Sequence, residues 1–110
     1  MHADYEDLEL PDVKELTPYN LYRYARDVIQ GRWPEAEPII IKDPKSTCFY
    51  ARDVIKGRWP EAEPTIMQDP ASACWYACEV IKDKWPEAEP IIMRNAYRWL
   101  DYCEHFGISE

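Results

Sequence analysis

The 110-residue sequence is poor in the residues on which most active sites depend. It has only three glycines, all at the ends of predicted helices, which excludes a glycine-rich loop that cradles phosphate. Of its two histidines, His2 is terminal, and His105 is expected to pair with Asp101 one helical turn earlier. No serine or cysteine on that face completes a nucleophilic set. The sequence therefore predicts a protein that is not an enzyme and binds no cofactor.

Long apolar runs are also missing. No stretch of about eighteen apolar residues exists, which excludes a membrane-spanning helix. The opening MHADYEDLEL is acidic and lacks the basic and apolar segments of a signal peptide. We therefore expect a cytoplasmic protein whose four cysteines are reduced thiols.

What the chain does have is a tandem repeat. A block reading YARDVIQGRWPEAEP starts at Tyr24, and near-copies start at Tyr50 and Tyr76, which gives a period of 26 residues. The segment WPEAEP is identical in all three copies. A unit this short cannot bury its own apolar face, so the copies must stack and share a continuous core.

Each copy is predicted to begin with a helix, here called helix A. Pairs that suit a helix start, an N-cap residue followed by proline or alanine, recur at one repeat position: Thr17-Pro18, Asp43-Pro44, Asp69-Pro70 and Asn95-Ala96. The four A helices are therefore expected at about residues 18–30, 44–56, 70–82 and 96–106. Gly31 and Gly57 suit left-handed C-caps, Asp83 takes that place in the third copy, and Gly107 closes the last helix.

A second helix, helix B, is predicted from Pro34 to Lys42 and at the equivalent positions. Pro38 either kinks this helix or delays its start, because an internal proline removes a backbone hydrogen bond and clashes with the preceding turn. Only Arg32-Trp33 separates helices A and B, and so short a link forces antiparallel neighbours. The sequence thus predicts an all-α fold in which αα-hairpins of 26 residues stack as a small α-solenoid.

The predicted domain covers residues 17–110, with repeats at about 17–42, 43–68 and 69–94 and a capping helix at 95–107. Residues 1–16 form an acidic N-terminal arm, in which six acidic residues oppose one lysine and so contribute −5 of the net charge of −8. Its segment Leu8–Leu16 is expected to cap the array as a degenerate helix B.

The string YARDVIKGRWPEAEP at residues 50–64, with its Asp-Pro spacers, resembles a tandem repeat found in uncharacterised proteins of bacteriophages and large DNA viruses. The resemblance covers residues 17–107 and implies an all-α repeat protein of viral origin. It implies no activity and no catalytic residue. The third copy departs from the pattern, with Cys78-Glu79 in place of Arg-Asp and Asp83-Lys84 in place of Gly-Arg.

The invariant aromatic residues admit two interpretations. They could form a ladder of platforms for a nucleic-acid strand, or they could anchor the core at the corner between helices A and B. Identity in every copy favours packing. We therefore assign to the structural core three tryptophans and three tyrosines: Trp33, Trp59, Trp85, Tyr24, Tyr50 and Tyr76.

The cysteines do not have the spacing of a zinc site. Cys74 and Cys78 are four residues apart on one helix, and Cys103 and His105 are two apart, so the latter side chains diverge. Cys48 and Cys74 share one repeat position, which is typical of a buried small residue. We predict no metal site.

The leading functional hypothesis is a non-catalytic viral repeat protein that binds a host or viral protein and inhibits a host defence complex. Partner contacts are expected at variable, exposed positions and in the acidic arm: Lys45, Ser46, Ala71, Asp4, Glu6 and Asp7. The alternative is a self-assembling structural repeat protein. A third reading, an acidic DNA mimic or nucleic-acid binder, is disfavoured by a pI near 4.7 and by the nearly neutral repeats.

Overall fold

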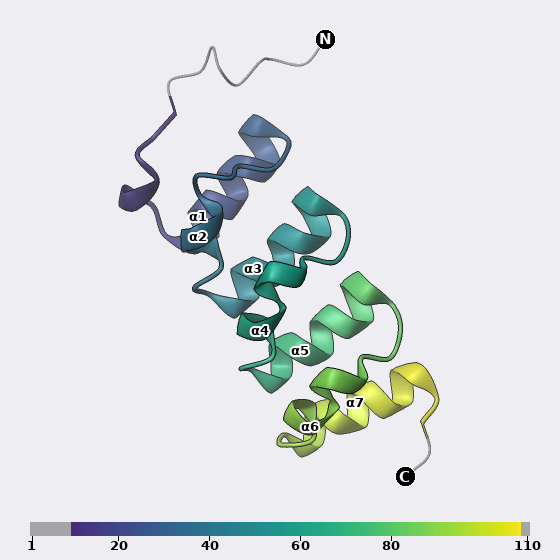
Figure 1. The fold of residues 1–110 in the computed structure, drawn as a ribbon. Coiled ribbons are helices and arrows are strands. Elements are labelled where there is room, and N and C mark those ends of the chain that lie inside the picture. The colour runs from purple at the N-terminus through teal and green to yellow at the C-terminus, as the bar shows by residue number, and fades with distance from the viewer. Residues whose placement is uncertain (1–9, 109–110) are drawn as a thin grey trace.

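The computed structural model describes residues 10–108. These residues form helices and turns and contain no strand, which confirms the all-α prediction. The helices pack as successive hairpins along an elongated array, with the A helices side by side and the short B helices beside them (Figure 1). The A helices are α1 (Pro18–Tyr24), α3 (Pro44–Tyr50), α5 (Pro70–Tyr76) and α7 (Ala96–Phe106).

The predicted N-caps explain where the A helices begin. The side chains of Thr17, Asp43 and Asp69 each accept a hydrogen bond from the backbone N–H three residues later, at 3.1, 3.2 and 3.2 Å. Proline follows the cap in the first three helices, where its missing N–H costs no helical hydrogen bond, and alanine follows it in the fourth.

The A helices end differently from the prediction. The first three run on into π-helical turns at Ala25–Ile29, Ala51–Ile55 and Ala77–Ile81. Each of these turns ends on a left-handed residue that is not glycine: Gln30, Lys56 and Lys82, with φ of 62°, 65° and 61°.

The predicted C-caps at Gly31 and Gly57 are therefore wrong. The wider turn directs the N–H of Gln30 to the carbonyl of Ala25, five residues back, at 2.7 Å, so the left-handed residue comes one position before the glycine. This also explains how the third copy ends its helix with Asp83 in the glycine position. Gly107, at φ 68°, does close α7 as expected.

Helix B starts later than Pro34. The B helices are single turns, α2 (Glu37–Ile40), α4 (Glu63–Ile66) and α6 (Glu89–Ile92), and 3-10 turns at Pro60–Ala62 and Pro86–Ala88 precede the last two. Pro38 therefore lies in the first turn of α2, where it neither breaks a hydrogen bond nor kinks the helix.

The described part of the N-terminal arm covers the first repeat. A 3-10 turn spans Val13–Glu15, and Leu10, Val13 and Leu16 are half-buried against the core. The predicted partner residues Asp4, Glu6 and Asp7 lie outside the described residues.

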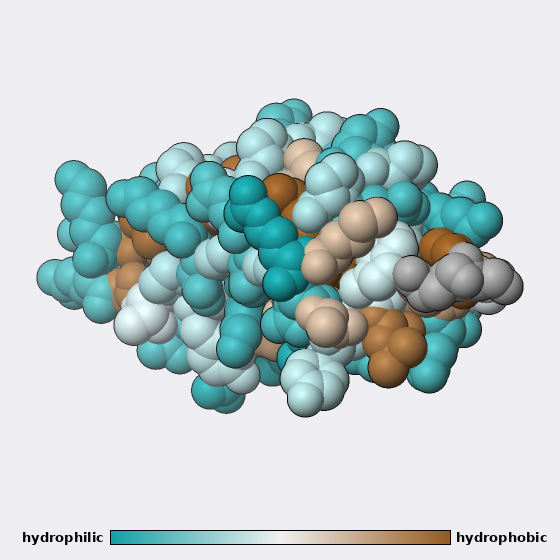
Figure 2. Space-filling model, turned by 90° about the horizontal axis from the view of Figure 1, so that it is seen from below, coloured by the Kyte–Doolittle hydropathy of each residue, from teal (hydrophilic) through white to brown (hydrophobic). Residues whose placement is uncertain are grey.

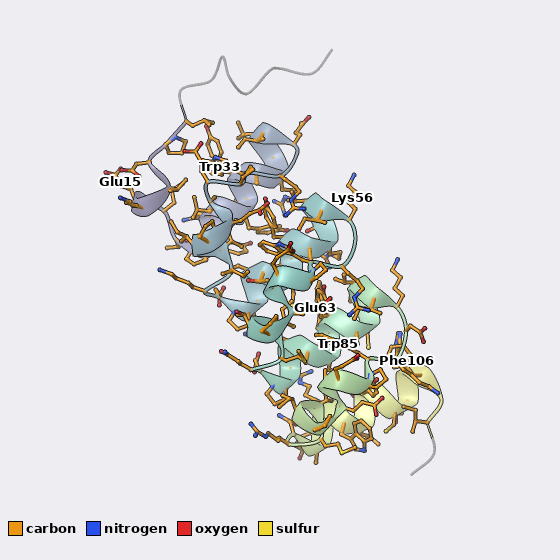
Figure 3. The ribbon with its side chains drawn as sticks, viewed as in Figure 1. Glu15, Trp33, Lys56, Glu63, Trp85 and Phe106 are labelled. Atoms are coloured by element: carbon orange, nitrogen blue, oxygen red, sulfur yellow. The ribbon has the colours of Figure 1, made fainter. Side chains whose placement is uncertain are left out.

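The invariant tryptophans lie inside the array. Trp33, Trp59 and Trp85 are only 1%, 2% and 2% exposed, so they cannot serve as platforms for a ligand. Figure 3 shows Trp33 and Trp85 among the packed helices, whereas Lys56 extends outward from the end of helix A in its repeat. Each indole packs on the tyrosine of its own copy, with ring centroids 5.4, 5.0 and 5.1 Å apart along the array.

A tyrosine hydroxyl joins each copy to the preceding one. The Tyr50 hydroxyl accepts a hydrogen bond from the backbone N–H of Trp33 and donates one to Glu37, both at 2.7 Å. Glu37 also forms a two-bond ion pair with Arg32, at 2.9 and 3.0 Å. The corner between helices A and B is thus closed by a residue from the next copy.

The same arrangement recurs twice along the array. Tyr76 bridges Trp59 and Glu63, and Tyr102 bridges Trp85 and Glu89. Tyr50, Tyr76 and Tyr102 are completely buried, whereas Tyr24 of the first copy is half-buried and its hydroxyl forms no hydrogen bond within the described residues.

The environment of this bridge changes the acidity of its members. Burial raises the pKa of the Tyr50 hydroxyl well above its usual value. Burial also pushes the pKa of Glu37 upward, but the Arg32 ion pair and the hydrogen bond from Tyr50 outweigh it, so the net pKa is lowered. A neutral tyrosine that donates to an ionised glutamate is therefore the stable state of the corner.

Replacing one bridging tyrosine tests how much the hydroxyl contributes. We expect Tyr76→Phe to lower the free energy of unfolding by about 1–3 kcal/mol, because the buried Trp59 N–H loses its acceptor and Glu63 loses one of its hydrogen-bond donors. The matched change Tyr24→Phe should stay within about 0.5 kcal/mol, because that hydroxyl bridges no corner. Urea unfolding followed by circular dichroism measures both values. Equal losses for the two variants would contradict the assigned role.

The tyrosine pKa values also predict how stability depends on alkaline pH. The pKa values of Tyr50, Tyr76 and Tyr102 are all raised, chiefly by burial. A raised pKa means that this stabilisation is complete below the unfolded pKa of about 10 and is lost progressively as pH rises above it. Urea midpoints should therefore fall steeply above about pH 10, and Tyr76→Phe should reduce that slope. A midpoint independent of pH between about 9 and 11 would contradict it.

Candidate functional site

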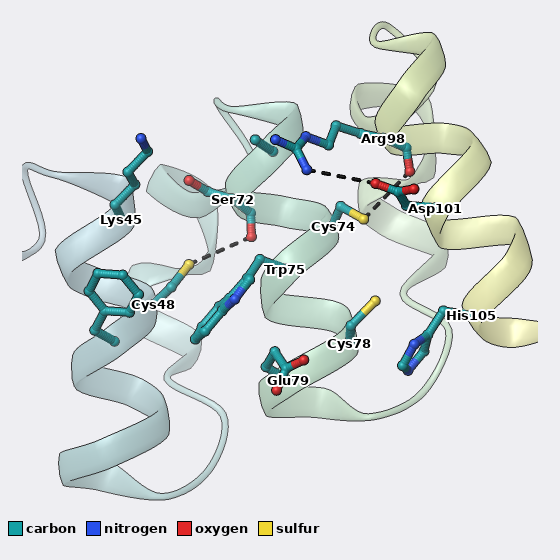
Figure 4. Close-up of a pocket in the computed structure, with 12 residues that line it drawn as sticks. Lys45, Cys48, Ser72, Cys74, Trp75, Cys78, Glu79, Arg98, Asp101 and His105 are labelled. Atoms are coloured by element: carbon teal, nitrogen blue, oxygen red, sulfur yellow. Dashed lines mark hydrogen bonds and ion pairs between the residues drawn. The ribbon is translucent and has the colours of Figure 1, made fainter.

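A groove of about 470 Å³ lies on the face formed by α3, α5 and α7 (Figure 4). Lys45, Cys48 and Phe49 come from α3, and Arg98, Asp101 and His105 come from α7. Between them, α5 and the π-turn after it contribute four small residues, one carboxylate and one large aromatic ring: Ala71, Ser72, Cys74, Cys78, Glu79 and Trp75.

The groove exists because side chains shrink along the repeat. Between α1 and α3, Tyr22 packs against Phe49 with ring centroids 5.6 Å apart. One and two copies later, the position of Tyr22 is taken by Cys48 and Cys74. The space that a tyrosine fills in the first copy is therefore left open over α5.

An aromatic column borders the groove and then stops. Phe49 meets Trp75 edge-on, with centroids 5.5 Å apart and planes at 88°. The next residue in the same repeat position is Asp101. The wall of the groove formed by α7 is consequently polar, whereas the side formed by Phe49 and Trp75 is aromatic.

Two arginines line this column in the earlier copies. The guanidinium of Arg52 lies 4.8 Å from the ring centroid of Trp75 and 5.7 Å from that of Phe49. Its Nε is 2.7 Å from the Asp53 carboxylate, which also accepts a hydrogen bond from the Tyr22 hydroxyl. Arg26 stacks on Tyr22 at 5.1 Å and pairs with Asp27 in the same way.

The three variable repeat residues that were predicted to contact a partner differ in their exposure and in whether they line the groove. Lys45 is exposed and Ala71 is half-buried, and both line the groove. Ser46 is 1% exposed, so the prediction that it lies at an exposed position is wrong. Its hydroxyl donates to the N-cap carboxylate of Asp43 at 2.5 Å, which turns the side chain back into the helix start. Ser72 repeats this contact at 2.6 Å, and the shared serine was a signal that the position is structural.

The groove holds no set of groups suited to nucleophilic or metal chemistry. Burial raises the pKa of the Cys48 thiol to about 12, and burial with the neighbouring Cys74 raises that of Cys78 to about 12. From residue 10 to residue 108, no three side chains of histidine, cysteine, aspartate or glutamate come close enough to hold a metal ion.

The predicted pairing of Asp101 with His105 is wrong. Asp101 lies 3.7 Å from Arg98 on the preceding turn, and the His105 ring packs edge-on against Phe106 with centroids 4.7 Å apart. Both Asp101 and His105 nevertheless face the groove. Their roles there are those of a charged and a polar wall residue.

Comparisons with protein-family models, with curated proteins and with solved structures found no match. Among the described helices, none is long and apolar enough to cross a membrane.

The raised thiol pKa values predict slow reaction with alkylating agents. Although Cys78 is partly exposed, at about pH 8 it should react with iodoacetamide on the order of a hundredfold more slowly than a free cysteine, because little thiolate is present. Peptide mass spectrometry after timed labelling measures the rate at each cysteine. Labelling in urea is the control and should restore the free rate. Rapid labelling of Cys78 in the folded protein would contradict the assignment.

Proposed function

We propose that the chain is a non-catalytic binding protein whose groove over α5 receives an extended segment of a protein partner. The observation that carries this proposal is the division of the repeat into two sets of residues. The tryptophans and tyrosines that join the copies are buried and identical, whereas four repeat positions that line the groove differ between the second and third copies: Lys45 and Ala71, Phe49 and Trp75, Arg52 and Cys78, Asp53 and Glu79. Stacking of the copies does not require an open groove, so the groove at the variable positions points to a second role.

The chemistry of the groove favours a peptide segment over a small ligand. It is open, crosses three helices and carries both charges on its walls, with Lys45 and Arg98 opposed by Glu79 and Asp101. Its aromatic side can take up apolar side chains, and its polar side can pair with charged ones. A volume of about 470 Å³ accommodates a few side chains.

The resemblance to viral repeat proteins adds the biological part of the proposal. We propose that the partner is a host protein and that binding inhibits a host defence complex. In this arrangement, the partner segment bound in the groove fixes the array on its partner. The rest of the array then blocks the partner surface next to that segment.

Self-assembly is the second candidate function. Exposed apolar residues at the C-terminal end of the array support it: Met93 at 52%, Tyr97 at 81% and Leu100 at 53%. Two observations weigh against it. Trp99 and Phe106 of the same helix cover Tyr102, with ring centroids 5.3 and 4.9 Å away, so the last bridging tyrosine is buried without another copy. Figure 2 also shows the apolar surface at this end as separate patches among hydrophilic residues. Light scattering that reports a monomer at micromolar concentration would remove this candidate.

A nucleic-acid function finds less support. Glu37 and Glu63 are each paired with an arginine of the same corner, at 2.9 and 2.8 Å, so they do not form an uncompensated ladder of carboxylates.

Blocking the groove tests the leading proposal. Peptides selected from a random library on the immobilised chain should lose about tenfold or more in affinity for Ala71→Arg, because the new side chain fills the groove. The variant should fold, since Tyr19, Lys45 and Tyr97 occupy the same repeat position. Ala96→Arg, at an exposed alanine of α7, is the matched control and should bind like the parent. If no selected peptide depends on Ala71, the proposed function is wrong.

A further inference from the structure

The third copy lacks the cation that fills the same place in the second copy. Arg52-Asp53 becomes Cys78-Glu79, so the arginine is lost and the carboxylate is kept. In the second copy, the Arg52 guanidinium lies over the rings of Phe49 and Trp75 and pairs with Asp53 at 2.7 Å. The chain thus contains its own example of how this surface holds an arginine.

The space equivalent to that of Arg52 is open in the third copy. Cys78 lines the groove with Trp75 beside it, and Trp75 stands where Phe49 stands in the second copy. In Figure 4, Cys78 and Glu79 of the π-turn lie across the groove from His105 of α7. Trp75 is half-buried, with the Arg52 guanidinium 4.8 Å from its ring centroid, and it lines the groove together with the short side chain of Cys78.

The charges that remain match a missing cation. The Glu79 side chain forms no hydrogen bond or ion pair with any described residue, although its counterpart Asp53 has partners in Arg52 and Tyr22. Among the described residues, Asp101 forms an ion pair with Arg98 alone, at 3.7 Å, and the two side chains are 58% and 48% exposed. Ion pairs that are open to solvent interact weakly, so Arg98 compensates little of the Asp101 charge.

We propose that the groove binds an arginine side chain of the partner segment, with its guanidinium over Trp75 and paired with Glu79. This inference rests on the proposed function and names the residue that anchors the partner. Arginine fits better than lysine, because its planar group stacks on an aromatic ring and donates two parallel hydrogen bonds to a carboxylate. Asp101 lies on the α7 wall of the groove, where it is a second carboxylate beside the proposed site.

A pair of small probes tests the arginine site without knowledge of the partner. N-acetyl-arginine amide should shift the Trp75 indole N–H and Cys78 amide resonances of the full chain in a saturable, salt-sensitive manner. The neutral isostere N-acetyl-citrulline amide should bind about three- to tenfold more weakly, as expected for an exposed ion pair with a stacked guanidinium. Equal shifts from the two probes would overturn the inference.

Two variants localise the effect. Glu79→Gln should reduce the affinity for the arginine probe to that for citrulline, whereas Glu87→Gln, an exposed glutamate of the same copy outside the groove, should have no effect. Cys78→Arg should fill the site from within the chain and abolish probe binding, with a Tm no lower than that of the parent. If Cys78→Arg fails to fold, Glu79→Gln still decides the question. Unchanged binding in Glu79→Gln would overturn the assignment.

The two proposals fail in different ways. If the arginine probe shows no preference over citrulline while library peptides still require an open groove at Ala71, the arginine site is wrong and the binding function stands. If library peptides are insensitive to Ala71→Arg, the binding function itself is wrong, whatever the probe does.

Discussion

At each corner between helices A and B, the hydrogen bonds of one tyrosine hydroxyl join two copies of the repeat. A repeat of 26 residues with a one-turn helix B has little core of its own, so its corner between helices must be closed from outside. Tyr50 does this for the first corner by accepting from the Trp33 backbone and donating to Glu37. Since the donor and acceptor belong to the preceding copy, no corner is complete until the next helix A has packed.

This dependence explains the distribution of identity along the chain. The tryptophan, the glutamate and the tyrosine act as one unit that spans two copies. Replacing the tyrosine leaves the buried tryptophan backbone N–H without its acceptor, whereas the tryptophan side chain contributes through the packing of its indole. The residues on the opposite side of helix A close no corner. Its residues pass from Tyr22 to Cys48 to Cys74, and the packing tolerates this because neighbouring A helices are already fixed through the corners.

The groove follows from that tolerance. Between the first and second copies the surface is filled, with Tyr22 against Phe49 and with Arg26 and Arg52 over aromatic rings. In the third copy the arginine and the large aromatic neighbour are both absent, yet Trp75 and a carboxylate remain. The array thus contains a filled and an open version of one arrangement, and the proposed arginine site is the open version completed by another molecule.

The sequence by itself determined the features that depend on short-range contacts. The helix starts could be predicted, because an N-cap such as Asp43 bonds a backbone N–H three residues away, and the 26-residue period required stacking. The helix ends could not, because the π-turn that places Gln30 in the left-handed region gave no recognisable signal and glycine at the next position misled the prediction.

Burial of Ser46 was missed although Ser72 repeats it, and the groove at Ala71, Cys78 and Glu79 could not be foreseen as a site. Only the tertiary structure decided these points, because they depend on which side chains of different helices meet across the stack, and a repeat pattern gives the spacing of those helices without the shape of the surface between them.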